Sequence, residues 1–223
     1  MEDLRRQEGR NLIAVGVYGS VAAGRERASS DLDLFVVIRR PRSRLRFHVR
    51  EGVLVALNVR TREEARADAT RPRSSFPEAL SGWRSMRPLY DPSGFLRALR
   101  TRALRTPASR FRESAREGFL QAYEDLGKLR NAAHSRDREE SREMAIWYTG
   151  GAMAILFCLE RHVPSTDRRV FAELRGLGTL GRRICELRYG SFSPRETARR
   201  ADRIWGALRA QAARQGIRVD DVP

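Results

Sequence analysis

The pattern of apolar and polar residues predicts strands in the first part of the chain. Two continuous apolar runs, Leu12 to Val17 and Leu34 to Ile38, have the length and flanking turn residues of buried strands. Residues 45–49 and 53–59 alternate between apolar and polar and enclose a short turn, which predicts a β-hairpin. Met1 to Arg10 predicts a short amphipathic helix before the first strand.

The pattern changes to helical spacing after Pro107. Apolar residues recur every three or four positions from Phe111 to about His134, which predicts one long amphipathic helix. Met144 to Leu159 is almost wholly apolar and predicts a helix buried on most sides. Further helices are expected over 167–175, 178–189 and from Ser193 to Gly216, where Pro194 and Glu196 are typical of a first helical turn.

Together these elements predict an α+β protein with two domains. We expect residues 1–105 to form a small α/β domain with a mixed sheet, and residues 106–223 to form a C-terminal helical bundle. Residues 70–94 are rich in Pro, Ser and Gly and predict a loop. Three apolar side chains in it, Trp83, Met86 and Leu89, are expected to pack inward.

Candidate chemistry lies between the two apolar runs. Asp31 and Asp33 open the second run, and alternate residues of a strand point to the same face. Two neighbouring carboxylates repel one another unless a cation lies between them, and carboxylate oxygens suit Mg²⁺. Gly19 allows close backbone approach, and Ser20 is expected to cap a short helix whose N–H groups hold a phosphate.

Composition narrows the possible partners. The net charge is +16, yet the basic residues are spread along the chain without a block, and all but Lys128 are arginine. This distribution argues against a nucleic-acid partner. Cys158 and Cys185 lie in helical patterns and are expected to be reduced core thiols. No signal peptide or membrane-spanning stretch is expected, so we predict a cytoplasmic protein.

A second pair of candidate residues lies on the first helix of the bundle. Glu124 and Lys128 are four residues apart and therefore share a helix face. The simplest interpretation is an exposed salt bridge of small energy. A lone lysine in an arginine-rich chain favours a specific need for a compact positive charge at this position.

These residues resemble a known family. The order Gly19-Ser20, Asp31-x-Asp33 and Glu124-x(3)-Lys128 resembles the polymerase-β-type nucleotidyltransferases, in particular the kanamycin nucleotidyltransferase group. The resemblance implies an enzyme of EC 2.7.7 type, which moves a nucleoside monophosphate from a Mg²⁺-bound nucleoside triphosphate to a hydroxyl of a small molecule such as an aminoglycoside antibiotic.

The resemblance also implies roles for the individual residues. Asp31 and Asp33 would hold the metal, and Gly19, Ser20 and Lys128 would bind the nucleotide. Glu124 and Lys128 would be catalytic, with Glu124 as the base. The family further implies antibiotic resistance as the biological role and a homodimer with a shared active site.

One position departs from the family pattern. The family usually places a third carboxylate on the strand after the hairpin turn, where this chain has Ala56. Asn58, two residues on, offers only a neutral oxygen. Because two-metal chemistry needs ligands for both ions, we expect one firmly held Mg²⁺ and a weak second. A catalytically weak or inactive nucleotide-binding homologue is therefore an alternative, and an antitoxin-like or RNA-directed nucleotidyltransferase is a third.

Overall fold

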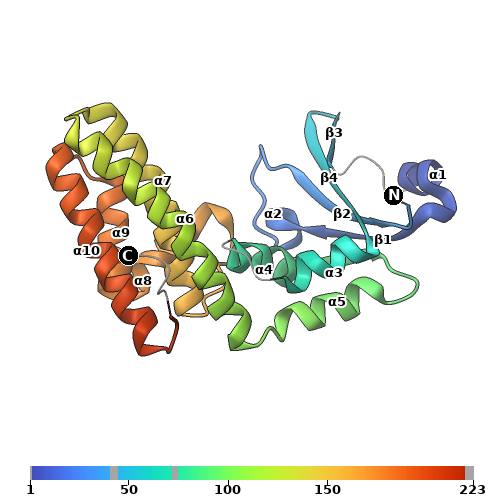
Figure 1. Cartoon of the computed structure of the whole chain (residues 1–223). Coiled ribbons are helices and arrows are strands. Elements are labelled where there is room, and N and C mark those ends of the chain that lie inside the picture. The colour runs from blue at the N-terminus through green and yellow to red at the C-terminus, as the bar shows by residue number, and fades with distance from the viewer. Residues whose placement is uncertain (1, 41–44, 72–74, 219–223) are drawn as a thin grey trace. The chain divides into compact units, whose positions relative to one another are not determined.

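A computed structural model of the chain describes residues 2–40, 45–71 and 75–218. The chain divides into two compact units (Figure 1). The N-terminal unit comprises Met1–Arg71 and Ala79–Thr106, and the helical unit comprises Pro72–Glu78 and Pro107–Pro223. The predicted α+β class is confirmed, with a mixed sheet followed by a helical C-terminal region.

The N-terminal unit is built on a five-stranded sheet in the order β3-β4-β2-β1-β5. Only β2 and β4 run parallel, and the other neighbours are antiparallel. The predicted strands and hairpin are confirmed. The strands are β1 (Leu12–Tyr18), β2 (Leu32–Ile38), β3 (Leu45–Arg50), β4 (Val53–Thr61) and β5 (Arg87–Tyr90).

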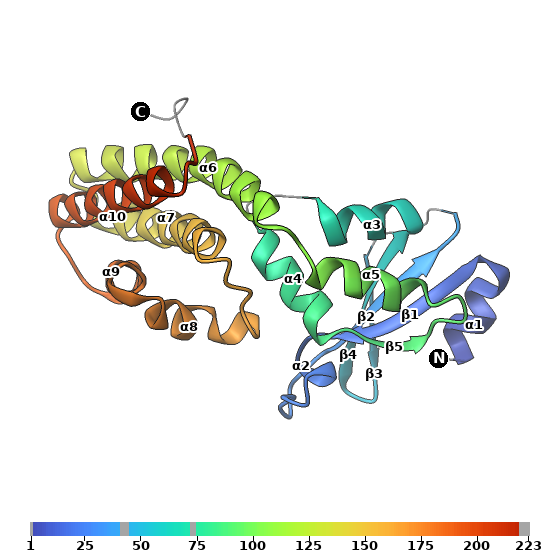
Figure 2. The ribbon, with the colours of Figure 1, turned by 90° about the horizontal axis from the view of Figure 1, so that it is seen from below.

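Helices accompany the sheet on both sides. Figures 1 and 2 show α3 and α5 side by side along one face, where the Thr61 hydroxyl and the Glu64 carboxylate form a complete capping box at the start of α3. On the other face, buried aliphatic residues of β1, β2 and β4 form a core with Leu4 and Ala22. The helical elements of the first 105 residues are α1 (Glu2–Glu8), η1 (Gly9–Asn11), α2 (Gly19–Ala22), α3 (Arg62–Thr70), α4 (Phe76–Ser85) and α5 (Phe95–Leu104).

The loop predicted over residues 70–94 is wrong where the structure describes it. Helix α4 and strand β5 occupy most of this stretch. Phe76, Leu80 and Trp83 are spaced as one helix face and are almost fully buried, so their burial outweighs the turn-forming residues between them. Met86 is buried as predicted, whereas Leu89 on the edge strand is 52% exposed.

The helical unit has its core between the long helices. Helix α7 packs along α6, and α10 packs on both, with Tyr148 completely buried and its hydroxyl donating to the Ala201 carbonyl over 3.0 Å. Cys158 and Cys185 are buried free thiols, as predicted. The bounds follow the predicted helices closely: α6 (Ala108–His134), α7 (Arg138–Leu159), η2 (Asp167–Arg169), α8 (Val170–Gly176), α9 (Gly178–Tyr189) and α10 (Pro194–Arg214).

Glu173 connects α8 to the segment before it. Its carboxylate lies 2.8 Å from His162 Nε2 and accepts hydrogen bonds from the backbone and hydroxyl of Ser165. Burial raises the pKa of Glu173, but these hydrogen bonds more than offset burial, so the pKa is lowered overall.

No helix of the described residues is both long and apolar enough to cross a membrane.

Candidate active site

The turn after β1 brings the backbone against a carboxylate. Gly19, the first residue of α2, has a φ of +74°, and a Cβ placed on it would lie 2.6 Å from Oδ2 of Asp33. Its N–H donates to the Ser85 hydroxyl over 3.1 Å. Both the left-handed conformation and the lack of space require glycine here. The two motifs predicted from the sequence, Gly19-Ser20 and Asp31-x-Asp33, are therefore in contact.

Ser20 does not have the predicted capping role. The N-cap of α2 is Tyr18, which makes no side-chain capping bond, and Ser20 is the second residue of the helix. The prediction failed because glycine itself enters the helix, which moves the cap one residue earlier than the usual Ser position. Ser20 is partly exposed beside the Gly19 turn.

Asp31 and Asp33 flank the start of β2. Asp31 immediately precedes the strand and Asp33 is its second residue, and both are partly buried. Leu34 is buried and Leu32 packs partly buried against the same core, as the alternation predicts. Asp33 pairs with Tyr18 of β1 on one side and with Ala56 of β4 on the other.

Ala56 occupies the place next to Asp33 where the family pattern puts a third carboxylate. It is 7% exposed, and its methyl group offers no ligand. Within the described residues, no three His, Cys, Asp or Glu side chains gather closely enough to hold a metal ion. Two carboxylates still fit one Mg²⁺, because this ion completes its octahedral shell with water and substrate phosphates. Two carboxylates alone are too few ligands for a pair of metal ions.

Glu124 and Lys128 form an ion pair on α6, in the helical unit. The Glu124 Oε1 to Lys128 Nζ distance is 2.8 Å, and both side chains are largely exposed. The hydrogen bond and charge of Lys128 lower the pKa of Glu124, and Glu124 in turn raises the pKa of Lys128. The structure thus pairs Glu124 with Lys128 in the helical unit, and it places Asp31 and Asp33 two residues apart at the start of β2 in the N-terminal unit.

Comparison with protein families finds a match to most of the first part of the N-terminal unit. Residues 2–78 match the family described as Nucleotidyltransferase domain. The match includes Gly19, Ser20, Asp31, Asp33 and Ala56. It covers about a third of the chain and does not resolve the kanamycin nucleotidyltransferase subgroup, which stays a prediction.

A solved structure shares the fold over almost the whole length. The crystal structure of a nucleotidyltransferase-like protein from Exiguobacterium sibiricum 255-15 superposes with a TM-score of 0.62 at 11% sequence identity, covering 95% of this chain and 75% of that chain. A comparison with curated proteins found no match. The likeness therefore supports the fold, an α+β unit followed by helices, as a known architecture.

The N-terminal unit has a further polar residue at this candidate site, Tyr18. Burial raises the pKa of Tyr18, a hydrogen bond with the Asn58 side chain opposes this, and the charges of Asp33 and Asp31 raise it further. The phenol is therefore protonated at neutral pH, beside two carboxylates. Sequence reasoning missed Tyr18, whose only signal is its position between a buried strand and the glycine turn.

Aromatic packing fixes the Tyr18 ring. It packs edge to face against Phe35, with 6.4 Å between the ring centroids, and the Phe35 and Trp83 ring centroids are 5.1 Å apart. Gly82 lies against the Tyr18 ring, so α4 approaches closely. Helix α4, which the sequence prediction missed, thus packs against the candidate site through these rings and through the hydrogen bond between Ser85 and Gly19.

Proposed function

We propose that the protein transfers a nucleoside monophosphate from a nucleoside triphosphate to a hydroxyl of a small molecule and releases pyrophosphate. The observation that carries this proposal is the contact of Gly19 with the Asp33 carboxylate, in a segment that matches the nucleotidyltransferase family. A glycine turn against paired carboxylates offers close backbone approach for phosphates and oxygen ligands for a cation in one place.

Asp31 and Asp33 would hold one Mg²⁺. When bound, the ion would neutralise triphosphate charge and polarise the phosphoryl group under attack. The backbone N–H groups around Gly19 and Ser20 are the groups that would approach the phosphates. Tyr18, as a neutral phenol beside the aspartates, would donate a hydrogen bond without adding charge.

Glu124 would remove the proton of the acceptor hydroxyl. Its lowered pKa keeps it ionised at neutral pH, so it is in the state that accepts a proton. Lys128 would leave the ion pair to neutralise phosphate charge, which a compact ammonium does well. Little covalent chemistry is needed beyond this, because phosphoryl transfer depends mainly on positioning and charge neutralisation.

The proposal also names a class of acceptor molecule, the aminoglycosides. Aminoglycosides are polyhydroxylated cations, and the acidic side chains of α6 (Glu113, Glu117, Glu124 and Asp125) are candidates to attract them locally despite the overall charge of +16. Antibiotic resistance, a cytoplasmic location and a homodimer with a shared site belong to the same proposal.

The test is turnover. The protein is incubated with Mg²⁺, each of the four nucleoside triphosphates and a panel of aminoglycosides, and pyrophosphate and nucleotidylated products are measured. Asp31→Asn is expected to abolish Mg²⁺-dependent triphosphate binding and turnover. The control Glu26→Gln removes an exposed charge from the same loop and should change neither. Unchanged activity in Asp31→Asn would exclude the metal role.

Ala56 favours a second candidate function, a nucleotide-binding protein without efficient catalysis. The missing carboxylate removes ligands for a second ion beside Asp33. This alternative predicts Mg²⁺-dependent triphosphate binding that Asp31→Asn abolishes, with no product from any acceptor. Calorimetry with a non-hydrolysable triphosphate measures this binding, and the absence of product from every acceptor separates the alternative from the enzymatic proposal.

A further inference from the structure

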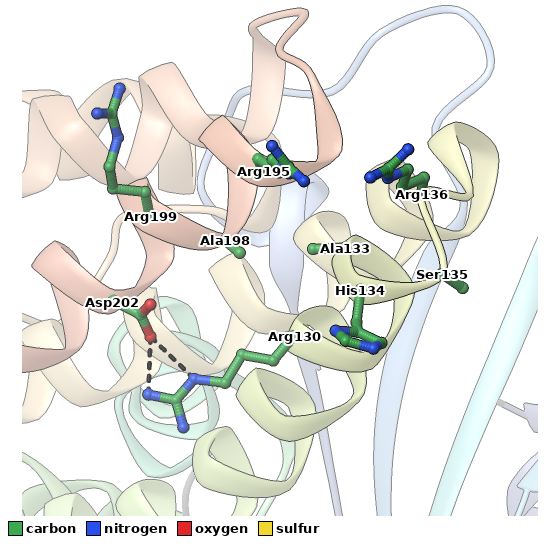
Figure 3. A pocket seen from close by; sticks show the side chains of 9 residues that line it. All are labelled: Arg130, Ala133, His134, Ser135, Arg136, Arg195, Ala198, Arg199 and Asp202. Atoms are coloured by element: carbon green, nitrogen blue, oxygen red, sulfur yellow. Dashed lines mark hydrogen bonds and ion pairs between the residues drawn. The ribbon is translucent and has the colours of Figure 1, made fainter.

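A basic pocket lies at one end of the helical unit, where α6 ends and α10 begins. Its volume is about 750 Å³, in the range of small-ligand pockets. Figure 3 shows side chains from both helices and from the turn after α6 around it. The lining residues are Arg130, Ala133, His134, Ser135, Arg136, Arg195, Ala198, Arg199 and Asp202.

Two of the four arginines already have carboxylate partners. Arg130 donates from Nε and Nη2 to Oδ1 of Asp202, over 2.9 and 2.7 Å. Arg199 pairs with Glu196 on the same helix. The first pair is nearly neutral, whereas the Glu196 carboxylate is shared with Arg200 and Arg203, so Arg199 keeps part of its positive charge.

The other two arginines, Arg136 and Arg195, have no carboxylate partner among the described residues. In Figure 3 their guanidinium groups point toward one another across the pocket. Two like charges that face each other repel, and an anion between them removes the repulsion. His134 adds a further polar side chain at the same rim.

Both arginines also lie where local structure disfavours them. Arg136 follows the C-terminus of α6 with a φ of +61°, a conformation that favours glycine. Arg195 lies in the first turn of α10, where the helix dipole disfavours a cation. Departures from local preference that converge on one pocket indicate a function for the side chains.

We propose that this pocket binds phosphate groups, with Arg136 and Arg195 as the principal ligands. Guanidinium groups suit this ligand because their planar N–H pairs bond two phosphate oxygens at once. The phosphates could belong to a free oligophosphate or to the backbone of single-stranded RNA. The site is separate from the proposed nucleotide site at Asp31 and does not depend on that function.

The experiment measures binding of tripolyphosphate and of a fluorescent single-stranded RNA 12-mer, in EDTA at about 0.1 M salt. The variant is Arg136→Gln with Arg195→Gln. The matched control is Arg209→Gln with Arg214→Gln, two exposed arginines of α10 outside the pocket, which lowers the net charge by the same two units. Circular dichroism checks that both variants remain folded.

We expect the pocket variant to weaken binding of at least one probe by tenfold or more and the control by less than about twofold. If RNA is the ligand, the slope of log K against log salt should also fall by about 1.4, at roughly 0.7 for each phosphate that an arginine no longer neutralises. Equal weakening in both variants would mean that overall charge is responsible and would overturn the proposal. No binding of either probe, or unchanged binding in the pocket variant, would overturn it as well.

Asp31→Asn separates this site from the nucleotide site. Because EDTA removes the metal, probe affinity should be unchanged in Asp31→Asn. A comparable loss of affinity in that variant would place the probes at the aspartates and contradict the proposal.

Discussion

Ala56→Asp tests whether the missing carboxylate is the feature that limits metal binding. Ala56 is 7% exposed and lies directly beside Asp33 in the parallel pairing of β2 and β4. The substitution would place two carboxylates about 5 Å apart, the spacing of adjacent strands. At an effective dielectric constant of about 20, their repulsion is about 3 kcal/mol. Because Asp33 is partly exposed, solvent screening reduces this to about 1–3 kcal/mol.

Magnesium should reverse the penalty. Ala56→Asn has the same size without the charge, so the difference between the two variants isolates the electrostatic part. With a dissociation constant of ~1 mM, ~10 mM Mg²⁺ would add about 1.4 kcal/mol to the Asp variant by linkage, besides relieving the repulsion. The Asn variant should gain less.

Hydrogen exchange measured by mass spectrometry on peptides from β2 and β4 gives the opening free energy of this part of the sheet directly. In EDTA, exchange should be faster in Ala56→Asp than in Ala56→Asn, and Mg²⁺ should reduce or invert the difference. Equal protection of the two variants in EDTA would refute the proximity of the charges. An Asp variant that gains no more from Mg²⁺ than the Asn variant would refute the metal site.

Three further predictions concern other parts of the chain. Gly19→Ala should abolish triphosphate binding, because its Cβ would lie 2.6 Å from the Asp33 carboxylate. The control Gly24→Ala has a similar positive φ but open space around it, so it should lose only about 1 kcal/mol of stability. Equal triphosphate affinity of the two variants would contradict the site geometry. Glu124→Gln should lower turnover at least about a hundredfold with nucleotide affinity unchanged, and a loss confined to thermal stability would make it structural. Glu173 has a lowered pKa in the folded state, so its contribution to stability is present above pH about 4.5 and is lost as the pH falls. In Glu173→Gln, the free energy of unfolding measured in urea should therefore depend less on pH between pH about 5 and 3. The same pH dependence in the variant and the original protein would argue against a lowered pKa of Glu173.

Much of the fold could be predicted from local pattern because burial is periodic in most elements. The strand alternation, the helix start at Ser193 and the long apolar helix all appear where the sequence places them. Helix α4 could not be predicted because Pro, Ser and Gly carry turn signals. Its stability comes from tertiary contacts of Phe76, Leu80 and Trp83, which no local window contains.

The site could be predicted in its residue types but not in its contacts. The spacing of the glycine turn and the aspartates indicated a phosphate and metal site, and the pairing of Asp33 with Ala56 follows from strand register. The contacts of Tyr18 and Ser85 depend on how α4 packs against the end of β1, a long-range arrangement that the motif does not contain. Ser20 was misplaced because a cap depends on where the helix actually begins.

In the proposed reaction, Ala56 also determines how much of the catalysis Glu124 would have to supply. In two-metal phosphoryl transfer the ions stabilise both the attacking and the leaving oxygens. With Ala56 in place of a ligand, the attacking hydroxyl would receive its activation from Glu124 alone, which makes turnover more dependent on that base. Ala56→Asp should therefore reduce the effect of Glu124→Gln, and the two substitutions should be non-additive in turnover at saturating Mg²⁺. Strict additivity would mean that the base and the missing ligand act on different steps.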